Sequence, residues 1–322
     1  MKLVVGLEAA SRENPGCVAT IGNFDGVHRG HRAVIDRLVA ESRRLSLPVC
    51  VVLFEPQPRE YFAPNQAPPR LMRLRDKIDR LSELPVDRVL VLKFNRSLAA
   101  LSPEAFIEKI LVETLGVRYL VIGDDFRFGR ARAGDFRLLV DAGARFGFEV
   151  QDTPSILADG QRISSTLIRE ALLRGELDLA GDLLGKPYEV CGRIIHGEKI
   201  GRTLGFPTAN LPLRRRSTPV RGVFAVTMRG LGPRPWPGVA NVGYRPTVQG
   251  DPALLLETHL LDFQGNLYGR RVEVEFHAKI RDEQRFDQLD DLRHQIARDI
   301  LAARDFFEGP FKIPRETLSP SC

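Results

Sequence analysis

The first 185 residues alternate between short apolar runs and longer segments whose apolar residues recur at helical spacing. Apolar runs that predict strands lie at 17–21, 49–54, 88–92, 119–122 and 148–151. Helical spacing occurs at 32–45, 71–84, 103–115 and 136–146, followed by shorter segments at 166–174 and 178–184. Strands that alternate with helices are typical of a parallel sheet covered on both faces. We therefore expect a first domain of the α/β class.

The pattern changes at Tyr188, where short strand-like runs separated by turns rich in glycine and proline begin. The runs lie at 188–195, 223–228, 238–242, 254–260 and 271–276, and the next long helical segment is 285–307. This order predicts a small antiparallel β-barrel or sandwich with a C-terminal helix packed on it. We place the boundary near Gly185, with domains at 1–185 and 186–308 and a loosely ordered tail at 309–322.

The most informative motif is GNFDGVHRGH at residues 22–31, between the predicted strand 17–21 and the helix that follows. A strand, a glycine loop and a helix start in this order are typical of a phosphate site in α/β folds. His28 and His31 are three residues apart, so both can project from the first helical turn toward one point. Two imidazoles beside a positive helix end suit a reaction that builds negative charge on phosphorus. The alternatives are half of a metal site, for which the sequence offers no third ligand, and a purely structural role.

A second motif, ISSTLIR at 163–169, follows the last predicted strand of the first domain and starts a helix. Capping of the helix would explain one hydroxyl, from Ser164 or Ser165. It explains neither three hydroxyls in a row, with Thr166, nor Arg169 one turn later. Arg169 and the hydroxyls would face the same helix end, where a di- or triphosphate could lie.

These two motifs resemble the signatures of nucleotidyltransferases that join an adenylyl or cytidylyl group to a phosphate. VLFEPQPREYF at 52–62, GDDFRFG at 123–129 and the barrel beyond make the chain similar to the bifunctional bacterial riboflavin kinase/FAD synthetases, from about residue 17 to 308. The resemblance implies a Rossmann-like nucleotidyltransferase domain followed by a riboflavin kinase-like barrel. It also implies that ATP, riboflavin and FMN are bound, and that FMN and FAD are products.

In the first domain, the resemblance implies that FMN attacks the α-phosphorus of ATP and that pyrophosphate leaves. His28, His31 and Arg169 would be catalytic, the two imidazoles stabilising the α-phosphate if they are at least partly protonated. Mg²⁺ is expected on the triphosphate. The residues implied to hold ATP are Gly22, Asn23, Phe24, Asp25, Gly26, His28, Gly30, His31, Ser164, Ser165, Thr166 and Arg169. Those implied on the flavin side are Pro56, Pro58, Phe62, Asp125 and Phe128. Many relatives have histidine where this chain has Gln57, so no histidine acts at that position.

In the second domain, the run at 197–210 (GEKIGRTLGFPTAN) is not a P-loop, because its spacing is one residue short and no helix follows. Thr208 and Asn210 are two apart on an extended chain and point to the same side. Their oxygens are hard ligands suited to Mg²⁺. In riboflavin kinases the same string forms the ATP and magnesium site, which implies roles for Gly197, Gly201, Arg202, Thr203, Gly205, Phe206, Pro207, Thr208 and Asn210. A flexible hairpin loop is the alternative.

Glu257 is a lone carboxylate in a leucine-rich run, where it is costly unless exposed or functional. Burial would make it a more useful base, and an exposed edge-strand glutamate is the alternative. The resemblance of ETHLLDF…NLYG to the kinase segment implies that Glu257 takes the proton from the ribityl 5′-hydroxyl of riboflavin. It also implies a flavin contact for Arg281, which could equally be a surface arginine. We assign no function to His196, His259, His277 or His294.

Composition narrows the class of protein without deciding it. A net charge of +6 fits acidic partners, including nucleic acid, yet Lys and Arg are spread along the chain except for Arg214-Arg215-Arg216, which we interpret as a solvated turn. Aromatic residues make up 7% and form no stripe between basic residues, so nucleic acid is not an expected partner.

No apolar run approaches the ~18 residues of a membrane span, and no secretory signal is evident. Four cysteines without metal spacing favour a reducing, cytoplasmic setting. The remaining alternatives are a related transferase with another phosphorylated acceptor and a basic RNA-binding protein; the sequence leaves the oligomeric state open.

Overall fold

The computed structural model describes residues 1–7, 16–123, 125–153, 156–158, 160–197, 205–245 and 253–309. The chain divides into two compact units, Met1–Ser165 and Thr166–Cys322. This division falls earlier in the chain than the boundary near Gly185 that we predicted. The physical reason is that helix α9 (Leu177–Leu184) packs against strand β14 (Arg271–Arg281) of the second unit. The functional boundary near residue 185 stays a prediction.

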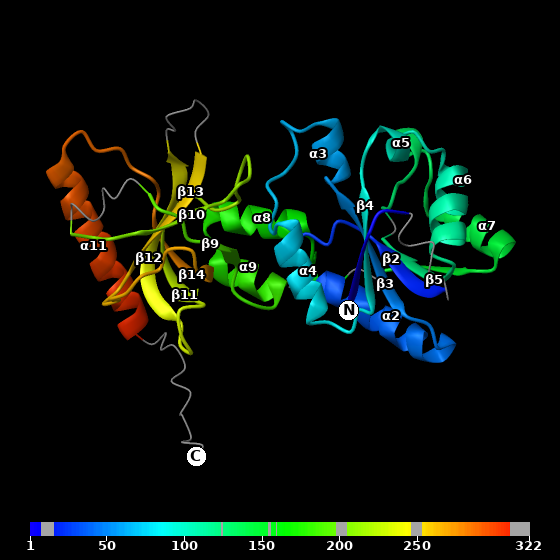
Figure 1. The fold of residues 1–322 in the computed structure, drawn as a ribbon, viewed down its shortest axis with the longest axis horizontal. Coiled ribbons are helices and arrows are strands. Elements are labelled where there is room, and N and C mark those ends of the chain that lie inside the picture. Colours follow the sequence, from blue (N-terminus) through cyan, green and yellow to red (C-terminus); the bar gives the residue numbers. More distant parts are fainter. Residues whose placement is uncertain are drawn as a thin grey trace, which may run out of the picture. The chain divides into compact units, whose positions relative to one another are not determined.

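The first unit contains the predicted parallel sheet, with six strands in the order β1-β4-β3-β2-β5-β6 (Figure 1). All neighbouring strands pair in parallel. The strands are β1 (Lys2–Val5), β2 (Cys17–Ile21), β3 (Val49–Glu55), β4 (Arg88–Lys93), β5 (Val117–Ile122) and β6 (Glu149–Asp152). The helices are α2 (Arg29–Leu45), α3 (Pro58–Phe62), α4 (Leu74–Ser82), α5 (Arg96–Ala99), α6 (Pro103–Phe106), η1 (Ile107–Thr114) and α7 (Phe136–Phe146). A short hairpin, β7 (Leu157–Ala158) and β8 (Gln161–Arg162), precedes α8 (Ser165–Arg174), which spans the division between the units.

Helices cover both faces of this sheet because its strands alternate their side chains between two hydrophobic clusters. On β2, Cys17 and Ala19 belong to one cluster and Val18 belongs to the other. The first cluster is completed by residues of α6, η1 and α7, and the second by residues of α2 and α4. Alternation of this kind is the period of two that any strand imposes on its side chains. The doubly wound α/β architecture is therefore confirmed.

The strand order places a topological switch point at β2. Its neighbours, β3 and β5, lie on opposite sides of it, and the chain winds away from β2 in both directions. In open α/β sheets, ligands bind outside the carboxyl ends of the strands at such a point. The segments that follow those ends are 22–28 after β2, 56–57 after β3 and 123–129 after β5. Three of the motifs identified in the sequence thus begin at one edge of one sheet.

The second unit is an antiparallel six-stranded sheet in the order β10-β13-β12-β11-β14-β9. Its strands are β9 (Glu189–Arg193), β10 (Ala209–Pro212), β11 (Gly222–Arg229), β12 (Trp236–Arg245), β13 (Ala253–Leu260) and β14. An isolated bridge between Ile195 and Asn210 brings the two edges together, so the barrel is nearly closed. Helix α11 (Leu289–Glu308) packs through Ala303 and Phe306 on the outer face of β11 and β12 (Figure 1). The predicted barrel with a terminal helix is confirmed.

None of the described helices combines the length and the hydrophobicity that crossing a bilayer requires.

A buried ion pair attaches α11 to the barrel, and its removal should destabilise the second unit. Arg281 donates to Asp299 from Nε at 2.8 Å and from Nη2 at 2.7 Å, and Asp299 is 4% exposed. We expect Asp299→Ala to lower the free energy of unfolding by about 3 kcal/mol, because it leaves the Arg281 cation largely buried and unpaired. Asp262→Ala is the matched control, since it removes the exposed pair that Asp262 makes with Arg304 of the same helix. The measurement is urea unfolding followed by the fluorescence of Trp236, the single tryptophan of the chain. Equal losses for the two variants would contradict this account.

Candidate active sites

The loop after β2 has an unusual backbone. Phe24 and Val27 have positive φ angles, 47° and 42°, a region that bulky residues rarely adopt. Both side chains are buried, each 2% exposed, so packing holds the loop in this conformation. Strain of this kind persists only where the surroundings impose it, and it is found at functional sites.

The two imidazoles of the loop are stacked on each other. His28 is the N-cap of α2, and its Nδ1 accepts the backbone N–H of His31 at 3.3 Å. The ring centroids lie 3.6 Å apart with an interplanar angle of 20°, and the Phe24 ring stacks on His31 at 4.5 Å. Gly30 leaves room for this arrangement, because a Cβ at that position would lie 3.1 Å from the His28 ring. The structure thus brings together the pair that the spacing predicted, at the amino end of a 17-residue helix.

The surroundings of His31 disfavour its protonated form in the free protein. Burial lowers the pKa of His31 well below its ordinary value of 6.5, and His28 and then Lys77 lower that pKa further. His31 Nδ1 is buried and has no hydrogen-bond partner among the described residues. Our expectation of at least partly protonated imidazoles concerned the pair beside phosphate, and the free protein does not test it; without phosphate, burial favours the neutral form of His31. Its ring nitrogen is therefore an unsatisfied polar atom next to a helix end.

The loop is held from behind by a buried carboxylate. Asp25 is 1% exposed, and its two oxygens accept the backbone N–H groups of Leu71 and Met72 at 3.0 and 3.1 Å. The carbonyl oxygen of Asp25 accepts the hydroxyl of Ser165 at 2.8 Å. Lys77, in α4, donates to the carbonyl oxygen of Asn23. Sequence reasoning missed Lys77; its only signal was a lysine within an otherwise amphipathic helical segment.

The second motif is only partly positioned by the structure. Ser165 is the first residue of α8 and contacts the loop, and Ser164 directly precedes it. Thr166 and Arg169 lie in the first two turns of α8 and belong to the second unit. Their approach to the histidine pair stays a prediction.

The predicted flavin residues after β3 lie around the short helix α3. Phe62 is 66% exposed, and its ring lies 5.2 Å from that of Tyr61 and 5.6 Å from that of Phe94. Pro56 and Pro58 flank Gln57, whose amide nitrogen is buried without a hydrogen-bond partner in the described part of the chain. An exposed aromatic group beside an unpaired amide donor suits a planar ligand with polar edges.

The predicted flavin residues after β5 have different environments. Phe128 is 6% exposed and packs in the hydrophobic core, 5.3 Å from the Phe106 ring and 5.6 Å from the Phe126 ring. Asp125 is exposed, and one of its carboxylate oxygens lies 3.8 Å from Arg162. In this structure Phe128 therefore supports the loop from within the core, and Asp125 lies at its surface.

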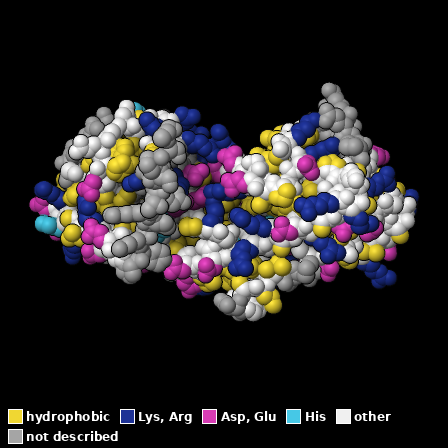
Figure 2. Space-filling model, turned by 90° about the horizontal axis from the view of Figure 1, so that it is seen from below, with side chains coloured by type: hydrophobic (Ala, Val, Ile, Leu, Met, Phe, Trp, Pro, Cys, Tyr) yellow, Lys and Arg dark blue, Asp and Glu magenta, His cyan; other side chains and the backbone are white. Residues whose placement is uncertain are grey.

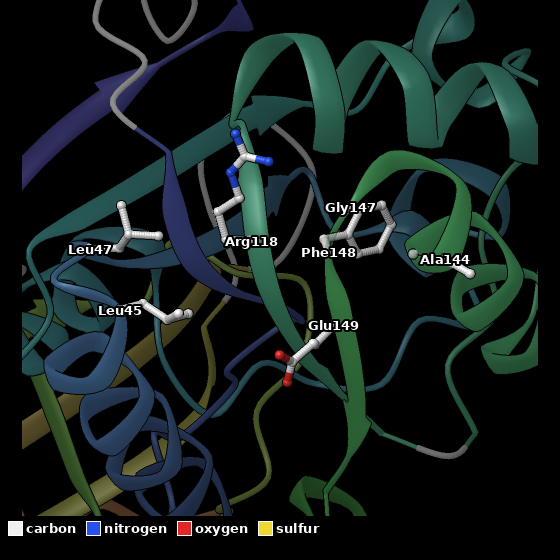
Figure 3. Close-up of a pocket in the computed structure, with 8 residues that line it drawn as sticks. Leu45, Leu47, Arg118, Ala144, Gly147, Phe148 and Glu149 are labelled. Atoms are coloured by element: carbon white, nitrogen blue, oxygen red, sulfur yellow. The ribbon is translucent and has the colours of Figure 1, made fainter.

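A hollow of about 640 Å³ in the first unit lies away from all these residues (Figure 3). Its lining includes Leu45 at the end of α2 and Leu47 after it, Arg118 near the start of β5, and Phe148 and Glu149 at the start of β6. These are the amino ends of parallel strands, the edge opposite the one that carries the motifs. None of the predicted site residues lines it.

In the second unit, three polar residues form a row across neighbouring strands. Glu257 of β13 is directly opposite Asn210 of β10 on one side and Asn241 of β12 on the other. Alternate residues of β13, such as Leu256 and Thr258, are buried, so Glu257 belongs to the outward set. Its carboxylate is partly exposed and pairs with Arg245, whose Nε donates to it at 3.0 Å. The Glu257 side chain is 23% exposed and is therefore partly, not fully, buried.

Asn210 is the most enclosed member of this row, at 6% exposed. Its amide nitrogen donates to the Thr208 carbonyl at 3.4 Å, and its backbone carbonyl accepts the Ile195 N–H at 2.9 Å. Gly197 lies flat against the amide, since a Cβ there would be 2.6 Å from Asn210 Cγ. Of the other predicted kinase residues, Gly205, Phe206 and Pro207 are described, with the Pro207 carbonyl 2.9 Å from His259 Nδ1. Gly201, Arg202 and Thr203 lie outside the described residues.

Thr208 and Asn210 supply oxygens of the kind that Mg²⁺ prefers. The described residues contain no group of three His, Cys, Asp or Glu side chains that could hold a metal. Arg281, predicted to contact flavin, is engaged with Asp299 of α11 and lies 6.0 Å from the Phe286 ring.

Charges of both signs are interspersed on the face of each unit that Figure 2 shows. Lys and Arg side chains alternate there with Asp and Glu side chains and with apolar patches, and no continuous basic strip is visible on that face.

Family comparison assigns both halves of the chain. The model of the FAD synthetase family matches residues 10–167, and the riboflavin kinase model matches residues 184–307. A bifunctional riboflavin kinase/FMN adenylyltransferase of Escherichia coli K12 is 54% identical over 308 residues, which cover 95% of this chain and 98% of that protein. The protein of the same name from Haemophilus influenzae is 53% identical over 309 residues, covering 96% and 100%.

A solved structure has the same fold over most of the chain. It is described as a macrolide-efflux protein from Streptococcus pneumoniae, with a TM-score of 0.77 and 28% identity, and it covers 95% of this chain and 99% of its own. Its description names another activity, whereas the relatives of more than half identity agree on theirs. The chain thus belongs to the bifunctional riboflavin kinase/FMN adenylyltransferase family, and it phosphorylates riboflavin to FMN and adenylylates FMN to FAD.

Proposed function

We propose that the two reactions are divided between the histidine loop of the first unit and the polar row of the second. The observation that carries the first assignment is the His28–His31 stack at the amino end of α2, at the switch point of the sheet. The second rests on the register that aligns Asn210, Glu257 and Asn241. Residues 1–185 would then catalyse adenylyl transfer, and residues 186–308 would catalyse the phosphorylation of riboflavin.

Adenylyl transfer needs no base in this scheme, because the attacking FMN phosphate is already ionised. Its oxygen forms a bond to the α-phosphorus of ATP as the bond to the bridging oxygen breaks, and pyrophosphate leaves. The N–H groups at the start of α2 and the two imidazoles stabilise the added charge. Ser164, Ser165, Thr166 and Arg169 would hold the departing phosphates, and the exposed Phe62 would contact the flavin.

Phosphorylation requires removal of a proton from the ribityl 5′-hydroxyl of riboflavin. The hydroxyl oxygen attacks the γ-phosphorus, its proton passes to Glu257, and ADP leaves with the electrons of the broken bond. Glu257 has to exchange its Arg245 partner for the hydroxyl, and its partial exposure permits this. Thr208 and Asn210 would hold Mg²⁺, which neutralises charge on the polyphosphate when bound.

The proposed setting is cytoplasmic, without a nucleic-acid or membrane partner. Cys17, Cys50 and Cys191 are buried free thiols, as a reducing compartment would leave them.

Removing one candidate from each site should separate the two activities. His28→Ala should lower FAD formation from FMN by roughly 100-fold or more, since it removes a group that stabilises the transition state. Glu257→Gln should lower FMN formation from riboflavin by about 100- to 10,000-fold through loss of the base. Both products are quantified by chromatography, and each variant serves as the other's control. Loss of both activities in either variant would contradict the division.

Gly197→Ala tests the position of Asn210. The added Cβ would overlap the Asn210 amide, so FMN formation should fall roughly 10- to 100-fold while FAD formation from FMN is unchanged. Gly232→Ala is the control, because nothing lies within 4 Å of a Cβ there. Steady-state kinetics of both reactions provide the measurement. Normal FMN formation by Gly197→Ala would show that this packing is irrelevant to the kinase.

Binding of ATP should change the protonation of His31. The pKa of His31 is lowered in the free protein, and an adjacent polyphosphate favours the protonated form, so binding takes up a proton. Affinity at this site therefore rises as the pH falls through the interval between the free and bound pKa values. Calorimetric titrations with ATP in two buffers of different ionisation enthalpy measure the uptake, with His31→Gln subtracted to remove the second ATP site. Identical uptake by wild type and variant would refute this.

A further inference from the structure

Lys77 is a lysine in a place where lysines are rarely found. It lies in the first half of α4, and its side chain is 1% exposed. Burying an ammonium group is costly unless it is paired, and lysine is almost never fully buried otherwise. The desolvation of the Lys77 ammonium group therefore has to be offset by interactions with the residues around it.

The contacts of Lys77 all belong to segments that carry the predicted adenylylation site. Its Nζ donates to the carbonyl oxygen of Asn23, within the strained loop that follows β2. Burial lowers its pKa, and the nearby carboxylates of Asp25, Glu55 and Glu60 oppose that effect. Glu55 and Glu60 flank the Pro56–Pro58 segment, where both accept hydrogen bonds from Arg70. One ammonium group thus lies between the candidate ATP loop and the candidate flavin segment.

We propose that Lys77 is a positioning residue for adenylyl transfer, which fixes the backbone of the histidine loop and so the orientation of the His28–His31 pair. The proposal rests on the function assigned above to that loop. Asp25 binds the loop to residues 71–72 through its carboxylate, and Lys77 binds it to α4 one turn later. A neutral side chain at position 77 would leave the Asn23 carbonyl and the Asp25 carboxylate without their cation.

The positive charge of Lys77 also affects the protonation of the His28–His31 pair. This effect distinguishes a role of the charge from a role of side-chain packing alone. The charge, together with burial and His28, lowers the pKa of His31. Arg32 follows His31 in α2, and Asp25, Glu55, Glu60 and Arg70 surround Lys77 from the other elements. Removing the cation at position 77 should therefore raise the pKa of His31, a change that loss of packing alone would not require.

The test compares Lys77→Met and Lys77→Arg in the full chain, with Lys109→Met as the control. Lys109 is an exposed lysine of η1 in the same unit. FAD formation from FMN should fall about tenfold or more in Lys77→Met, mainly in kcat, because misplacement of catalytic groups has effects of this size. FMN formation from riboflavin should be unchanged. Lys77→Arg should recover part of the lost activity, and Lys109→Met should match wild type.

The spectroscopic part follows the six histidines by NMR as a function of pH. The His31 signal, assigned with His31→Gln, should titrate at higher pH in Lys77→Met than in wild type, and at the wild-type position in Lys77→Arg. If Lys77→Met does not fold, Lys77→Gln replaces it; that variant keeps a donor for Asn23 and loses the charge. It should fold and show the same displaced His31 titration.

Three outcomes would overturn the proposal. They are normal FAD formation in Lys77→Met or Lys77→Gln, an unmoved His31 titration in the neutral variants, and failure of both neutral variants to fold. The last would make Lys77 a structural residue only. Failure of the proposed function itself is recognised separately, since His28→Ala would then retain FAD formation whatever Lys77 does.

Discussion

The buried carboxylate of Asp25 is the constraint on which the first site depends. The loop after β2 adopts positive φ angles at Phe24 and Val27, and such a conformation needs external restraint. Asp25 provides it from the middle of the loop, by accepting two backbone N–H groups of residues 71–72. A carboxylate can be buried in this way because each of its oxygens accepts a hydrogen bond and a cation lies near. The histidine pair follows from this loop, and the Ser165 hydroxyl and the Lys77 ammonium group both donate to its carbonyl oxygens.

The second site depends on strand register instead of on a strained loop. Pairing of β10, β13 and β12 aligns Asn210, Glu257 and Asn241, and a one-residue slip of any of these strands would turn its member of the row to the other face. Asn210 lies on the short strand β10. The bridge from Ile195 and the close packing of Gly197 against its amide group hold it in position. The chain therefore combines two ways of fixing the residues of the two proposed sites, one by a restrained loop and one by strand register.

Elements with strong periodicity could be predicted from the sequence. The bounds of β2 and α7 agree with the prediction at both ends, because β2 is buried on both faces and α7 begins at the cap Asp135 and ends at Gly147. β1 was not predicted, and for β10 the sequence indicated only an extended chain at 208–210. The His28–His31 pair was predictable from spacing on a helix. Lys77 was not, because a lysine on an amphipathic helix normally faces solvent, and its burial depends on a partner 54 residues away.

The lowered pKa of His31 is consistent with a loop that is stable without ligand and that, in the proposed function, binds a polyphosphate. Two imidazolium rings stacked at 3.6 Å would repel each other and Lys77, so the free loop favours at least one neutral ring. A polyphosphate at the amino end of α2 would favour the protonated ring instead. Its negative charge would offset the repulsion, and the buried Nδ1 of His31 would have a hydrogen-bond partner. The ring would then carry more positive charge when phosphate is present than when it is absent. A positive charge that forms on His31 only when the ligand is bound stabilises the complex without destabilising the free protein. Asp25 and Lys77 make this possible because they hold the loop in place before the ligand binds.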